Sequence, residues 1–105
     1  MKTLNYDLTD GANDNLITRK VKGSELLFQM WYTGVVAANV SVEAWISTVE
    51  EGPYAKIIDG EKTIVGADNT VYLSLSGVNG GWVRFKLTVP TADTAGTITK
   101  ADVLT

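Results

Sequence analysis

The acidic residues are the first candidates for chemistry in this sequence, because it contains no histidine and no cysteine. The absence of histidine and cysteine removes the commonest general base, the usual partner of a nucleophilic serine, and the ligands of most zinc and redox sites. Two carboxylates could still hydrolyse a glycoside if they stood about 5 to 9.5 Å apart across a cleft. Glu50 and Glu51 are sequence neighbours beside a turn, which is more typical of a solvated turn. We therefore expect a protein that is not an enzyme.

Two loops could hold an ion or a cofactor. Residues 10–15 offer oxygen ligands, but their spacing lacks the alternate acids and terminal glutamate of an EF-hand. An Asx-rich turn is the favoured interpretation, with a calcium site as the alternative. The glycines of residues 77–81 do not have the spacing of a phosphate-binding loop, and we interpret them as hairpin glycines. We expect no cofactor and no bound metal.

Size and composition favour one folded domain over residues 1–105, because 105 residues with 45% apolar content leave room for a single core. The net charge of −3 opposes binding to a phosphate backbone, so nucleic acid is not an expected partner. No apolar stretch is long enough to cross a bilayer, and the first residues do not resemble a signal segment. We expect no membrane association.

Short segments of alternating polarity, separated by turn residues, indicate strands throughout. The alternation predicts an all-β fold: one antiparallel β-sandwich, jelly-roll or immunoglobulin-like, of about eight to nine short strands. The dipeptide Asp59-Gly60 predicts a tight hairpin between two of them. The nine expected segments are residues 3–8, 16–21, 26–33, 40–48, 54–58, 63–66, 70–76, 82–89 and 97–104.

The same alternation assigns one face of four segments to the core, because successive side chains of a strand point to opposite sides. Two packed sheets would bury all four rows. These inward rows are Val71, Leu73 and Leu75; Val83, Phe85, Leu87 and Val89; Val40, Val42, Ala44 and Ile46; and Phe28, Met30 and Tyr32.

The opposite rows contain Trp31, Trp45 and Trp82, together with Glu43 and Arg84. Tryptophan is enriched at buried interface anchors, so these five residues are our candidates for a partner interface. The alternative is that the rings cap the ends of the sandwich, or that a bulge reverses the phase of a strand. Trp45 is the strongest candidate because polar neighbours at positions 41, 43 and 47 define its face.

Several stretches of this sequence are similar to small virion proteins of tailed phages, over roughly residues 26–105. In that group, a strand, an aromatic-x-Arg-aromatic strand and an Ala-Gly-Thr-Ile-Thr strand close a β-sandwich of this length. Glu51-Gly52 replaces the Asp-Gly that the group carries at a turn. The similar stretches are residues 45–47, 51–57, 70–75, 81–89 and 94–99.

This resemblance implies a non-enzymatic capsid decoration or auxiliary head protein of a bacteriophage. Its partners would be the major capsid protein or other virion proteins, and it would form a homo-oligomer, a trimer being one arrangement. It would be assembled into the virion in the cytoplasm of a bacterial host. The alternative, based on the same tryptophans, is a carbohydrate-binding or host-adhesion module of a head fibre or tail.

Overall fold

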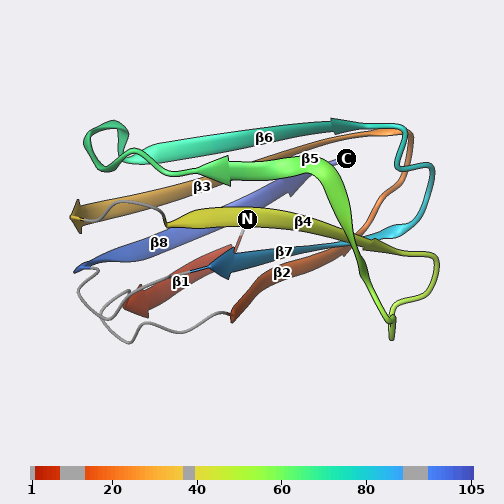
Figure 1. The fold of residues 1–105 in the computed structure, drawn as a ribbon, viewed down its shortest axis with the longest axis horizontal. Coiled ribbons are helices and arrows are strands. Elements are labelled where there is room, and N and C mark those ends of the chain that lie inside the picture. Colours follow the sequence, from red (N-terminus) through yellow and green to blue (C-terminus); the bar gives the residue numbers. More distant parts are fainter. Residues whose placement is uncertain (1, 8–13, 37–39, 89–94) are drawn as a thin grey trace.

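The computed structural model describes residues 2–7, 14–36, 40–88 and 95–105 (Figure 1). They form two four-stranded sheets in which every paired strand is antiparallel. The β3 sheet has the order β1 (Lys2–Asp7), β8 (Ala95–Leu104), β3 (Glu25–Val36), β6 (Thr70–Ser76). The β4 sheet has the order β2 (Asp14–Lys20), β7 (Trp82–Thr88), β4 (Ser41–Ser47), β5 (Ala55–Thr63). A 3₁₀ turn, η2 (Gly66–Asp68), precedes β6. The expected all-β class is confirmed, and the two sheets are consistent with a β-sandwich.

The core lies between the sheets and includes the described residues that alternation assigned to it. Phe28 of β3 stacks on Phe85 of β7, with ring centroids 4.1 Å apart, and neither residue is exposed. The inward rows of β3, β4, β6 and β7 are buried, except that Ile46 is only partly buried. Val89 lies outside the described residues. The period of two found these four rows because each sheet has one face against the other. It did not assign the buried residues of β2 and β8, such as Ile98, whose pairings contain register irregularities.

The prediction of a hairpin at Asp59-Gly60 is wrong. Residues 54–58 and 63–66 were expected as separate strands, but β5 runs from Ala55 to Thr63, so the structure has fewer strands than expected segments. On β4, a single residue separates Glu43 from Trp45. Their partners on β5, Glu61 and Lys56, are separated by four residues, 57–60. Asp59 takes the positive φ of 63°. The turn residues therefore form a large bulge within one strand, rather than a connection between two.

The glycines of residues 77–81 do not form a hairpin between paired strands. They connect β6 to β7, and these strands belong to different sheets. Gly77 and Gly80 have φ angles of 74°, as a tight change of direction requires. The expectation of turn glycines is thus confirmed, whereas the expectation that they join neighbouring strands is wrong.

Within the described ranges, no helix has the length and apolar character needed to span a bilayer.

Candidate functional site

Four of the five predicted interface residues lie together on the outer surface of the β4 sheet. Trp45 lies opposite Arg84 in the pairing of β4 with β7, and Glu43 and Trp82 occupy outward positions of the same two strands. We call this surface the β4-sheet face. It consists of Glu43, Trp45, Tyr54, Lys56, Glu61, Trp82, Arg84 and Lys86. Trp31 is not part of it, because β3 carries Trp31 on the outer surface of the other sheet.

Trp45 lies near the middle of the β4-sheet face and is half-buried. Its indole Nε1 donates a hydrogen bond to Glu43 Oε1 at 3.3 Å. Lys86 places its Nζ 4.5 Å from the centroid of the ring, in the position of a cation–π contact. The indole is therefore held in one orientation by a carboxylate at its edge and a cation over its face.

Glu43 also belongs to an ion-pair network that the β5 bulge makes possible. Lys56 Nζ lies 2.9 Å from Glu43 Oε2 and 2.9 Å from Glu61 Oε2. Lys56 and Glu61 are five residues apart on one strand, yet the bulge brings both beside Glu43. The network could not form on a regular β5, because side chains five positions apart point to opposite faces.

The network shifts the pKa values of Glu43 and Lys56. The hydrogen bond from Lys56 lowers the pKa of the Glu43 carboxyl, desolvation by partial burial opposes this, and the bond from Trp45 adds to the lowering. Hydrogen bonds to Glu61 and Glu43 raise the pKa of Lys56. Glu43 and Lys56 are therefore both charged at neutral pH, and each stabilises the charged form of the other.

Arg84 makes a second cation–aromatic contact beside Trp45. Its Cζ lies 4.0 Å from the centroid of the Tyr54 ring, and its Nε donates a hydrogen bond to Thr18 Oγ1 at 3.2 Å. The Tyr54 hydroxyl donates to the carbonyl oxygen of Glu50 at 2.7 Å. Arg84 thus connects β2, β7 and the segment that enters β5.

The remaining two tryptophans are placed differently from each other. Trp82 is half-buried on β7, between Lys20 of β2 and Ser47 of β4. Trp31 is half-buried on the β3 sheet, and Lys100 Nζ lies 4.7 Å from the centroid of its ring. The two outer surfaces therefore each carry a tryptophan covered by a lysine, Trp45 on one and Trp31 on the other.

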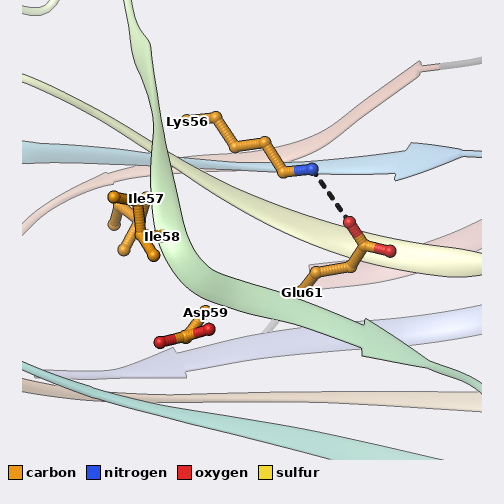
Figure 2. Close-up of a pocket in the computed structure, with 5 residues that line it drawn as sticks. All are labelled: Lys56, Ile57, Ile58, Asp59 and Glu61. Atoms are coloured by element: carbon orange, nitrogen blue, oxygen red, sulfur yellow. Dashed lines mark hydrogen bonds and ion pairs between the residues drawn. The ribbon is translucent and has the colours of Figure 1, made fainter.

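The described residues that line a hollow beside the bulge all belong to β5; Figure 2 shows Lys56, Ile57, Ile58, Asp59 and Glu61. Lys56 reaches across to Glu61, whereas Ile58 is 88% exposed. None of the described residues that line this hollow is aromatic. Among the described residues, no group of three or more acidic side chains is placed to hold a metal ion. The loop of residues 10–15, where a calcium site was the alternative, lies largely outside the described ranges.

Sequence reasoning missed Tyr54, Lys56 and Glu61 as members of the β4-sheet face. Lys86 and Arg84 follow from alternation on a regular strand, but the other three depend on the β5 bulge or on the loop before β5. The sequence carried one usable signal, the Asp59-Gly60 pair, which marks a break in a strand without saying whether the chain reverses.

No protein-family model matches this chain, and the comparison with curated proteins found no relative.

Proposed function

We propose that this chain is a non-enzymatic structural protein of a bacteriophage virion, a capsid decoration or auxiliary head protein that binds the capsid lattice through the β4-sheet face. The proposal rests on two supports of different kinds. The first is the resemblance of residues 26–105 to small virion proteins of tailed phages. The second is the arrangement of side chains on the β4-sheet face.

The proposal includes a jelly-roll topology. The strand orders β1-β8-β3-β6 and β2-β7-β4-β5 place the first and last strands side by side, and successive strands alternate between the two sheets up to β4. Such an order is what two interleaved Greek keys produce. Jelly rolls occur in viral capsid proteins and in lectins, so the topology agrees both with capsid decoration and with carbohydrate binding.

The observation that carries the choice is the set of cations over the aromatic rings. Sugar rings stack on open aromatic faces, but Lys86 lies over Trp45 and Arg84 lies over Tyr54. A ligand would have to displace these cations before it could stack. Trp, Tyr and Arg are also the residues that dominate the energy of protein–protein interfaces. Binding to a protein surface therefore explains the β4-sheet face better than binding to a glycan.

Trp82 supports the alternative function, a carbohydrate-binding or host-adhesion module of a head fibre or tail. It is half-buried at an outward position, and none of the cation contacts observed in the described residues involves its ring. A glycan array, followed by quenching of tryptophan fluorescence by the sugars that bind, tests this function. Binding that is lost in Trp82→Ala would favour the adhesion module over capsid decoration.

The capsid-binding proposal is tested by co-sedimentation of the purified chain with capsids that lack it. We expect Trp45→Ala to weaken binding by about thirtyfold or more, because a central interface tryptophan contributes about 2 kcal/mol or more. Trp31→Ala is the matched control, since it removes the same side chain and a similar lysine contact from the opposite surface. Circular dichroism establishes that both variants are folded.

Equal binding by the wild type and a folded Trp45→Ala variant would contradict the assignment of the β4-sheet face. Loss of binding in Trp31→Ala alone would move the interface to the β3 sheet. Failure of the wild-type chain to bind capsids would contradict the proposed function itself.

A further inference from the structure

The edge strands of the two sheets are not protected in the same way. An open edge presents unpaired backbone groups, and proteins usually protect it with bulges, charged residues or proline. Within the described part of the chain, the edge strands are β1 and β6 in the β3 sheet, and β2 and β5 in the β4 sheet. The register of β1, β2 and β5 with their neighbours is interrupted by an irregularity in each case. Each of these three strands also contains charged residues of both signs.

Strand β6 has none of these protective features. Its seven residues, TVYLSLS, include no charged residue, no proline and no glycine. Its pairing with β3 is continuous from Thr70 to Ser76, with no shift in register. A regular, uncharged edge of this kind is a template for pairing with another strand.

The core beneath β6 is also less well covered than the core beneath a central strand. The inward residues Val71, Leu73 and Leu75 are each 7–8% exposed, whereas the inward residues of β7 are completely buried. The difference follows from position, because β7 has a neighbour on both sides and β6 is paired on one side only. A further strand beside β6 would cover these three side chains.

We propose that β6 pairs antiparallel with β6 of a second copy of this chain, which joins two β3 sheets into one continuous sheet across a two-fold axis. The register that overlaps all seven residues places Leu73 opposite Leu73 of the second copy and Tyr72 opposite Ser74. Apolar residues then meet apolar residues on the core side, and no like charges face each other. A second copy fits this edge because the strand is complementary to itself in this register.

The outer surface beside β6 is compatible with this arrangement. Tyr72 is 60% exposed, and its nearest described cation is Lys62 of β5, with Nζ 5.6 Å from the ring centroid.

Pairing through a single strand buries less than the roughly 800 Å² per partner of a standard interface. We therefore expect a dimer whose dissociation constant lies in the micromolar range, so that the measured mass depends on concentration. This inference does not depend on the proposed function.

The test is sedimentation equilibrium of the full chain over a range of concentrations, starting from the mass of 11.3 kDa for one copy. The wild type is expected to approach twice this mass as its concentration rises. The variant Tyr72→Glu/Ser74→Glu places glutamate opposite glutamate at two pairs. The matched variant Tyr72→Glu/Ser74→Lys places glutamate opposite lysine at the same pairs.

We expect the dissociation constant of the first variant to exceed that of the second by about tenfold or more. Both variants change only outward positions of β6, and thermal denaturation of the dilute monomers establishes that both fold. A wild type that stays monomeric, forms a trimer or aggregates without a defined mass would overturn the proposal. A dimer that responds equally to both variants would overturn the pairing through β6.

Discussion

Replacing Gly60 by alanine tests the bulge that builds the ion-pair network of the β4-sheet face. Gly60 is buried, and its φ lies outside the left-handed region, so alanine can adopt its backbone conformation. An added Cβ would lie 3.0 Å from Ile57 Cβ, 3.1 Å from the Ile57 carbonyl oxygen and 3.2 Å from Ala44 Cβ. All three atoms belong to the backbone or are attached directly to it, so none can move away by a side-chain rotation.

The expected magnitude follows from two opposing effects. Inserting a methyl group into a closely packed site costs about 1–3 kcal/mol of folding free energy. Replacing glycine by alanine also restricts the unfolded chain, which stabilises the folded state by about 0.4–1 kcal/mol. The net expectation is that Gly60→Ala lowers the free energy of unfolding by about 1–2 kcal/mol.

Urea denaturation of the wild type, Gly60→Ala and Gly23→Ala measures this effect. Gly23 is the matched control, because a Cβ there would meet nothing within 4 Å and its φ is also outside the left-handed region. Gly23→Ala is expected to be slightly more stable than the wild type, since only the effect on the unfolded chain remains. If Gly60→Ala proves as stable as Gly23→Ala, the close packing of the bulge against Ala44 is wrong.

Two further predictions concern the network and the core. Because Lys56 lowers the pKa of Glu43, the stabilisation from this carboxylate is present above the unfolded value of about 4.3 and is lost as the pH falls through the lowered folded value. An NMR titration of the Glu43 carboxyl should show a higher midpoint in Lys56→Met, and an unchanged midpoint would contradict the network. In the core, Phe28→Leu and Phe85→Leu should each cost about 1–2 kcal/mol, with a coupling of about 0.5–1.5 kcal/mol in a double-mutant cycle measured in urea. Strictly additive costs would argue against the stacked rings.

The part of the core formed by β3, β4, β6 and β7 could be predicted from sequence, because regular strands with one buried face show a period of two. The buried residues of β8, such as Ile98, were not assigned. Phe28, Phe85 and Leu73 were assigned to the interior by this criterion, and all three are buried. The order of strands in the sheets could not be predicted in this way, since it depends on pairing between distant segments. The connection from β6 to β7 illustrates the difference: the glycines marked a turn, but only the pairing of each strand shows that the chain crosses between sheets.

The candidate face could be predicted only in part. Trp45 and Arg84 lie at outward positions of regular strands, so alternation placed both correctly on an outer surface. Alternation could not show that Trp31 lies on the other outer surface, because this depends on which sheet contains β3. Lys56 joined the face through a bulge, whose extra residues shift the phase of the strand and defeat alternation.

The most direct test of the central proposal is the copy number of this chain in purified virus particles from the source lysate, measured by quantitative mass spectrometry against the major capsid protein. Capsid decoration predicts a fixed ratio to the major capsid protein, with many copies in each particle. A few copies per particle would indicate a tail or fibre component instead, and absence from the particles would contradict a role in the virion.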